Sequence, residues 1–316
     1  MLATALSCSV AAAQTPDRPV TIVVPFSAGG PTDRVARDLG GALAKALGRR
    51  VIIENAGGAG GTLGATKVAK AAPDGDTLLL HHIGMATAPA LYRSLPFRPL
   101  EDFDFLGLFI EVPMTLVGRP SLTAKDFPSL VVWLRANRGK ARLADAGLGA
   151  ASHLCGLLLQ QRLGLDLRTI SFKGTGPAMS ELLGGQVDIL CDQTTNTTGP
   201  IAEGHVRAYA VTTLKPLPTP PFANLPTLDS LGLDGLQVTI WHGLYAPRGT
   251  PAAVAASLNA ALRQVLRDPA YAARQRALGA SLIDDDRLTP AGHRRFVAAE
   301  IERWAPTIRA AGQYAD

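Results

Sequence analysis

A stretch near the N-terminus combines residue types that suit the binding of an anion. Residues 20–24 form a short β-branched run typical of a buried parallel strand. The turn after it contains Gly29 and Gly30, which allow the backbone to bring successive N–H groups to one side, and Pro31 suits the first position of a helix. A helix N-terminus carries unpaired N–H donors and the positive end of the helix dipole. The pattern therefore predicts an anion site over 26–33, and a helix start without a ligand is the alternative.

Three later segments also combine a strand with a short loop rich in glycine and hydroxyl groups. The predicted strands span 141–146, 168–172 and 187–191. In a parallel sheet the carboxyl ends of such strands lie along one edge, where ligands bind. We therefore expect a cleft that is lined by the loops after these strands, 147–153, 173–177 and 192–194.

The residue types favour binding over catalysis. No serine has the G-x-S-x-G context of a hydrolase nucleophile, and the six histidines include no H-x-x-x-H pair for a metal. His153 is either a polar site residue or a capping or core histidine of a helix that starts beside it. Asp33 more often caps a helix than contacts an anion, which it would repel. A cleft enzyme, such as a hydrolase or isomerase acting on a small acidic metabolite, is the alternative function.

Length and composition indicate a globular protein of two α/β lobes. The chain has 316 residues, of which 47% are hydrophobic and 18% are charged, so it can bury a sizeable core. The formal net charge of +5 comes from scattered Lys and Arg residues, and aromatic residues make up only 5%. Because the sequence shows no basic stripe with interleaved aromatic residues, we expect no nucleic-acid partner. The positive charge fits an acidic small molecule.

The N-terminus resembles the end of a secretory signal. Residues 1–13 carry no charged side chain and finish with three alanines before a polar segment, which predicts export with cleavage there. An ordinary frayed N-terminus is the alternative. The mature chain would keep Cys155 and Cys191, both in apolar surroundings. We predict buried free thiols here rather than a bridge or a metal pair, and no metal site.

Alternating strands and helices position the loops described above. Further strands are predicted at 50–55, 77–81, 103–109, 113–118 and 206–212, with a strand pair at 236–246. Helices are predicted at 127–137, 250–266, 269–278 and 289–310. The pattern restarts after 119–120, where a crossing between lobes is expected. The glycine loop at 57–64 resembles a dinucleotide fingerprint but lacks the acidic strand end that should follow it, so no cofactor is predicted.

Five short motifs occur together and in order along nearly the whole mature chain. They are PFSAGGPTD at 25–33, EN at 54–55 with GAGGTLG at 58–64, APDG at 72–75, LLGGQVD at 182–188 and APRGTP at 246–251. This set resembles the Bug family, the substrate-binding proteins of tripartite tricarboxylate transporters in bacterial periplasms. The resemblance implies a type II periplasmic-binding-protein fold, in which two α/β lobes are joined by two crossing segments and hold a small carboxylate between them.

The resemblance also implies a set of ligand-binding residues. Backbone N–H groups and the hydroxyls of Ser27 and Thr32 would hold a carboxylate on the first lobe. Ala150 stands near where relatives usually carry a serine, and Gln193 where they often carry Asn or Ser, and both departures bear on the ligand's identity. The complete candidate set is Phe26, Ser27, Ala28, Gly29, Gly30, Thr32, Asp33, Gly149, Ala150, Ser152, His153, Gly174, Thr175, Gly176, Asp192 and Gln193.

The implied organisation places residues 14–118 and 236–316 in lobe 1 and residues 119–235 in lobe 2. The implied protein is a periplasmic monomer whose partners are a small carboxylate and the membrane permease subunits of such a transporter. Lys173 is the only cation in the loops around Ser27, Ser152 and Thr175, and these loops contain no arginine. We therefore expect helix N-termini, rather than a guanidinium clamp, to hold the carboxylate.

Overall fold

The computed structural model describes residues 18–310, 312 and 314. The predicted export signal at 1–13 lies outside the described residues. The strands are β1 Val20–Val24, β2 Val51–Asn55, β3 Thr77–His81, β4 Phe103–Gly118, β5 Arg142–Asp145, β6 Arg168–Ser171, β7 Ile189–Gln193, β8 Arg207–Val211, β9 Thr239–Pro247 and β10 Ser281–Leu282. The helices are α1 Pro31–Leu47, α2 Thr62–Ala69, α3 Gly84–Leu91, α4 Phe127–Ala136, α5 Ala151–Leu163, α6 Thr175–Leu183, α7 Thr194–Ala202, α8 Ala252–Leu266, α9 Pro269–Ala277 and α10 Pro290–Ala310.

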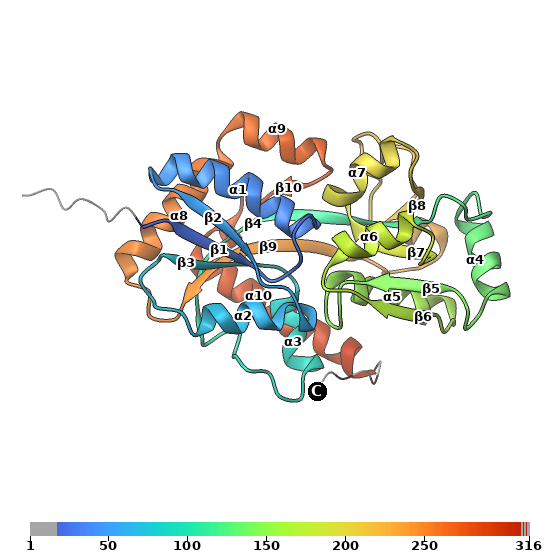
Figure 1. Ribbon diagram of the computed structural model, residues 1–316, viewed down its shortest axis with the longest axis horizontal. Helices are drawn as coiled ribbons and strands as arrows, with labels where there is room; N and C mark the ends of the chain where they lie inside the picture. The colour runs from blue at the N-terminus through green and yellow to red at the C-terminus, as the bar shows by residue number, and fades with distance from the viewer. Residues whose placement is uncertain (1–17, 311, 313, 315–316) are drawn as a thin grey trace, which may run out of the picture.

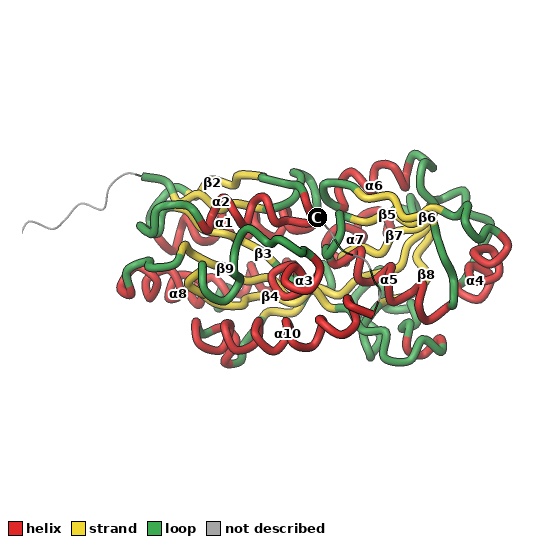
Figure 2. The backbone as a smooth tube through the Cα atoms, turned by 90° about the horizontal axis from the view of Figure 1, so that it is seen from below, coloured by secondary structure: helices red, strands yellow, loops and turns green. Residues whose placement is uncertain are grey.

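Two α/β lobes lie side by side and share their central strands (Figure 1). Lobe 1 contains the parallel strands β2, β1 and β3 with helices α1, α2, α3, α8, α9 and α10, and lobe 2 contains β5 to β8 with α4 to α7. Strand order along the sheet is β2-β1-β3-β9-β4-β7-β5-β6, with β8 and β10 also paired to β4. Figure 2 shows the strands of both halves joined through the middle of the molecule. The two-lobe fold predicted from the resemblance is confirmed.

Strand β4 differs from the prediction, which placed two strands at 103–109 and 113–118. It is one continuous strand that pairs with β9 through Pro113, then with β7 from Met114 and with β8 from Thr115 onward. Two register shifts against β9 bend it, and Pro113 lies where β4 changes neighbours, a position at which a missing N–H is tolerated. The predicted strand pair at 236–246 is likewise wrong, because a single strand, β9, runs antiparallel along β4.

The run of β-branched residues at β1 lies in the core of lobe 1. β1 lies between β2 and β3, and four of its five residues are fully buried, as expected for a parallel strand covered on both faces. Helix α1 packs Val35, Leu39 and Leu43 inward and ends at Gly48, whose φ of +62° is the left-handed value of a helix C-cap. The predicted strand, turn and helix are therefore confirmed. No described helix is long and apolar enough to cross a membrane.

Candidate functional site

The loop between β1 and α1 is held in shape by Asp33. Its carboxylate accepts hydrogen bonds from the Gly29 N–H and the Arg37 Nε, both at 2.9 Å, and from the Asn55 Nδ2 at 2.9 Å. Partial burial alone would raise the pKa of this carboxyl, but the three hydrogen bonds and the charge of Arg37 outweigh it and lower the pKa below its usual value. Asp33 therefore stays ionised and fixes the loop that leads into α1.

The two glycines of this loop have different roles. Gly29 has a φ of +79°, which L-residues avoid, so the expected need for conformational freedom holds there. Gly30 is in the ordinary extended region with a φ of −81°, and for this residue the expectation was wrong. A Cβ at Gly30 would lie 3.4 Å from the N atom of Gly176 on lobe 2, which is ordinary van der Waals contact, so space does not require a glycine there. The N-termini of α1 and α6 thus face each other directly.

The loop before α5 is stabilised by its own side chains. Ser152 Oγ accepts a hydrogen bond from the Ala146 N–H at 2.8 Å, and His153 Nδ1 accepts one from the Gly149 N–H at 3.3 Å. Gly149 has a φ of +77°, so a glycine is required for this turn. These bonds point the start of α5 toward lobe 1. His153 is buried in the first turn of α5 and supports the loop from within.

The two lobes are in direct contact across their loops. The N–H and the hydroxyl of Ser27 both donate to the carbonyl oxygen of Lys173, at 3.0 and 2.9 Å. The hydroxyl of Thr87 on lobe 1 donates to the carbonyl oxygen of Gly149 on lobe 2 at 2.8 Å. Main-chain carbonyl groups of lobe 2 therefore accept all three bonds. The structure is a closed arrangement of the lobes.

The closed lobes leave a small cavity between them. Its volume is about 20 Å³, which is room for about one water molecule. Small-molecule pockets are typically about 300–1,000 Å³, so the lobes must move apart from this arrangement to admit a carboxylate. Its lining residues are Phe26, Gly30, Pro31, Thr32, His82, Met114, Ala146, Ala150, Ala151, Ser152, Thr175, Asp192 and Gln193.

The cavity brings together candidates from every predicted loop. Eight candidates line it: Phe26, Gly30, Thr32, Ala150, Ser152, Thr175, Asp192 and Gln193. The others lie in the same loops but outside the lining, namely Ser27, Ala28, Gly29, Asp33, Gly149, His153, Gly174 and Gly176. Ser27 and Lys173 instead border a separate, larger pocket that residues of both lobes line. The binding role of the candidate set stays a prediction.

Five of the lining residues were not predicted from the sequence, namely Pro31, His82, Met114, Ala146 and Ala151. His82 follows the end of β3, so its place after a strand was a usable signal. Its ring stacks on Phe26 with centroids 4.6 Å apart, and burial lowers its pKa to about 3. His82 Nδ1 accepts from the Gly84 N–H at 3.2 Å, so the neutral ring carries its proton on Nε2. Nothing local marked Met114, which lies inside β4.

Four helix N-termini meet around the cavity. The lining includes residues at the starts of α1, α5 and α6 and the N-cap residue of α7, Gln193. In the part of the chain that the structure describes, no lysine or arginine belongs to the lining. Because each helix start offers N–H groups without intrahelical partners and a positive dipole end, the cavity can hold an anion without a cationic side chain. This arrangement is the main chemical property of the site.

Asp192 is the one ionisable carboxyl among the described residues that line the cavity. It is fully buried at the end of β7, and burial raises its pKa to about 6 despite hydrogen bonds from Asn196, Thr175 and the Gln193 N–H. The Gln193 N–H donates to Oδ1 at 2.8 Å and the Asn196 Nδ2 to Oδ2 at 2.5 Å. An anion bound beside this carboxyl would favour its protonated form.

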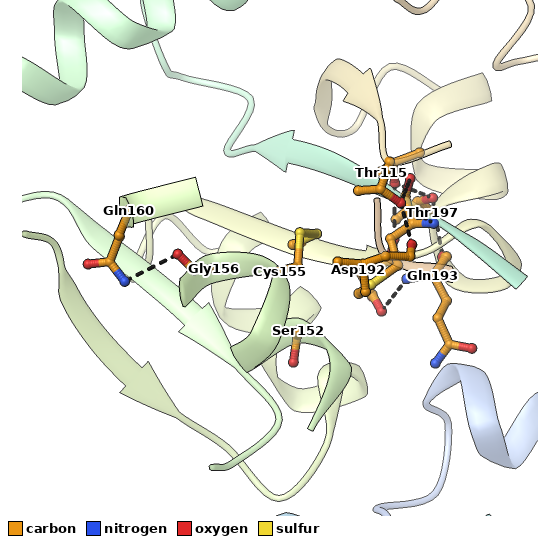
Figure 3. Close-up of a disulfide and its surroundings, with 12 residues drawn as sticks. Thr115, Ser152, Cys155, Gly156, Gln160, Asp192, Gln193 and Thr197 are labelled. Carbon is orange, nitrogen blue, oxygen red and sulfur yellow. Dashed lines mark hydrogen bonds between the residues drawn. A yellow bond between two sulfur atoms is a disulfide. The ribbon is translucent and has the colours of Figure 1, made fainter. Parts of the chain in front are cut away.

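The cysteines correct the sequence prediction, because Cys155 and Cys191 form a disulfide. Cys155 lies on α5 three residues after Ser152, and Cys191 lies on β7 directly before Asp192 (Figure 3). Their Cα atoms are 6.2 Å apart, within the range that a disulfide spans. The prediction of free thiols failed because packing of α5 on β7 joins positions 36 residues apart. The bridge ties together two elements that line the cavity.

Comparison with known proteins assigns the family. The family model described as "Tripartite tricarboxylate transporter family receptor" matches residues 35–313. A curated protein of Agrobacterium vitis, the UPF0065 protein in the TAR-I ttuE-ttuC' intergenic region, is 48% identical over 298 residues, which cover 94% of this chain and 86% of that protein.

Solved structures agree with this assignment and confirm the resemblance to the Bug family. The periplasmic binding protein BugD is 46% identical with a TM-score of 0.92, over 96% of this chain and 100% of BugD. MatC from Rhodopseudomonas palustris with bound malate is 41% identical with a TM-score of 0.88, over 93% of this chain and 100% of MatC. The chain therefore belongs to the tripartite tricarboxylate transporter receptor family, and it has the fold of a periplasmic binding protein.

Proposed function

We propose that this protein captures a small carboxylate in the cavity between its lobes and delivers it, chemically unchanged, to the permease subunits of a tripartite tricarboxylate-type transporter. The observation that carries this proposal is the convergence of four helix N-termini on a cavity whose described lining residues include no lysine or arginine. MatC, which has bound malate, supports a ligand of this class.

Each lobe supplies one set of donors in this proposal. A ligand in the open protein first meets the α1 loop, where Thr32 and the backbone N–H groups hold one carboxylate. Closing then brings the starts of α5 and α6, with Ser152 and Thr175, onto the other end of the ligand. Because only the closed form offers both sets of donors, the ligand shifts the open and closed populations toward the closed form.

The lobe boundaries and the cellular setting belong to the same proposal. We assign 14–118 and 236–316 to lobe 1 and 119–235 to lobe 2, with bending where β4 and β9 pass between the lobes. Family membership and the periplasmic neighbours indicate a periplasmic protein. We further propose a monomer that is exported with cleavage of the segment 1–13 and docks on its permease when closed.

A thermal melting screen of the purified mature protein tests this function. The panel contains dicarboxylates, tricarboxylates, acidic amino acids, aromatic acids, nucleotides and uncharged sugars. A ligand at one hundred times its dissociation constant adds about 2.7 kcal/mol to the free energy of unfolding, which raises the melting temperature by a few degrees. Stabilisation only by uncharged compounds or nucleotides would contradict the proposal. Recovery of the stabilising acid as a different compound would indicate an enzyme.

A further inference from the structure

Gln193 is a buried amide whose oxygen has no partner. Its side chain lines the cavity and only 4% of the residue is exposed. The main-chain N–H donates to Asp192 and the main-chain carbonyl accepts from Thr197. The side-chain Oε1, in contrast, is buried and receives no hydrogen bond from any residue that the structure describes. Figure 3 shows this side chain extending away from the disulfide and toward the blue helix, α1. A buried acceptor of this kind destabilises the free protein unless a donor reaches it.

The strand end that carries Gln193 differs chemically from the rest of the site. Helix starts elsewhere around the cavity offer N–H donors, which suit carboxylate oxygens. The end of β7 carries acceptors, the Oε1 of Gln193 and the carboxyl of Asp192, and both residues line the cavity. An ionised dicarboxylate without substituents has only acceptors, so it leaves Oε1 unpaired. A ligand that also carries a hydroxyl or an ammonium group can donate to it.

We propose that Gln193 is a specificity-determining residue that accepts a hydrogen bond from a donor group on the ligand. The favoured ligand is then a short dicarboxylate with a hydroxyl or amino substituent rather than an unsubstituted one. This inference rests on the proposed carboxylate-binding function. It adds that the ligand carries a hydrogen-bond donor between its two carboxylates. Both substituents supply the same donor chemistry, and the experiment below distinguishes them.

Calorimetric titration of the full mature chain with four acids tests the inference. The acids are succinate, L-malate, D-malate and L-aspartate, and the proteins are wild type, Gln193→Met and Gln193→Glu. Methionine keeps the length and shape of glutamine but removes its acceptor. Gln186→Met, at an exposed site on lobe 2, is the matched control. Malate identifies a hydroxyl donor and aspartate an ammonium donor.

We expect wild type to bind malate or aspartate at least tenfold more tightly than succinate. Gln193→Met should raise the Kd of the preferred ligand about tenfold and change the Kd of succinate less than threefold. Gln193→Glu should retain part of the preference for the substituted acid over succinate. The melting temperature of ligand-free Gln193→Met should not fall, because the variant removes an unpaired acceptor. This measurement also verifies that the variant folds.

Three results would overturn the inference. Succinate could bind wild type as tightly as either substituted acid, or Gln193→Met could weaken all four acids equally, which would mean that the amide donates to a carboxylate. The third is an unchanged preference in Gln193→Met. In each case carboxylate binding itself persists, so the proposed function would survive. Failure of every acid to bind would instead refute the proposed function.

Discussion

Substitution of Gly60 by alanine should block closing of the lobes. Gly60 lies on lobe 1 with a φ of +60°, and a Cβ there would lie 2.0 Å from the carbonyl oxygen of Leu148 on lobe 2. Since real Cβ atoms essentially never approach closer than 3.0 Å, the two loops must separate by at least about 1 Å. This clash exists only between the lobes. Within lobe 1 the Cβ would meet the hydroxyl oxygen of Tyr92 at 3.1 Å, which a side-chain shift of a few tenths of an ångström relieves. An open protein can therefore accept the methyl group, whereas the closed form cannot.

The loss can be estimated from the hydrogen bonds that closing makes. The two bonds from Ser27 to the carbonyl of Lys173 and the bond from Thr87 to the carbonyl of Gly149 are 2.8–3.0 Å long. Lengthening by about 1 Å takes all three beyond hydrogen-bonding distance. At about 1 kcal/mol each, their loss weakens ligand binding by about 3 kcal/mol, which is about a hundredfold in Kd.

Gly48→Ala is the matched control. Gly48 has a φ of +62°, and a Cβ there would meet no atom within 4 Å. Both variants therefore carry a similar backbone strain of about 1–2 kcal/mol, but only Gly60→Ala obstructs closing. Urea unfolding of the ligand-free proteins and calorimetric titration with the best acid from the melting screen measure the two effects separately. A Kd for Gly60→Ala within threefold of that for Gly48→Ala would refute this account of closing.

Three further outcomes are expected. Ser27→Ala should weaken ligand binding by about 1 kcal/mol in a titration, because one interlobe hydrogen bond is lost. Lys173→Ala should have little effect, because only the main-chain carbonyl of Lys173 takes part in that bond. A larger loss for Lys173→Ala than for Ser27→Ala would point to the ammonium charge as the determinant. Burial raises the pKa of Asp192 from its ordinary value of 3.8 to about 6 in the folded chain, so the folded state binds more protons than the unfolded state between these pH values. The melting temperature of the ligand-free protein should therefore rise as pH falls from 7.5 to 5. Ligand affinity should also rise as pH falls, because a bound anion favours the protonated carboxyl. Asp192→Asn should flatten both pH profiles, and profiles that keep their slope in this variant would exclude Asp192 as their cause. Replacing Cys155 and Cys191 by alanine should lower the free energy of unfolding in urea by about 3–4 kcal/mol, and two titratable thiols in the denatured mature wild type would disprove the disulfide.

The sequence by itself determined the parts of the protein that depend on near neighbours in the chain. The run at β1, the turn at Gly29 and the apolar spacing of α1 could be predicted, because each depends on backbone preferences and on packing of one amphipathic face. Pro269 and Pro290 likewise marked the true starts of α9 and α10. The loops that line the cavity were also predictable, because they follow strands whose carboxyl ends lie along the same edge of a parallel sheet.

Only the tertiary structure decided which loop residues reach the cavity. Asp33 and His153 lie in the predicted loops, but their side chains accept hydrogen bonds from the loop backbone and neither residue lines the cavity. His82 and Met114 do line it, although His82 is marked only by its place after β3 and Met114 by no local pattern. Spacing in the chain identifies a loop, but side-chain direction depends on partners from other elements, such as Asn55 for the carboxylate of Asp33.

Contacts between distant segments account for the remaining differences. β4 is continuous because β9 pairs along most of it and β7 and β8 pair with the rest, and Cys155 meets Cys191 because α5 packs on β7. The closing contact joins Ser27 to Lys173, which are 146 positions apart. Burial and hydrogen bonding across such separations depend on the whole packed arrangement, so no local pattern of residues could specify them.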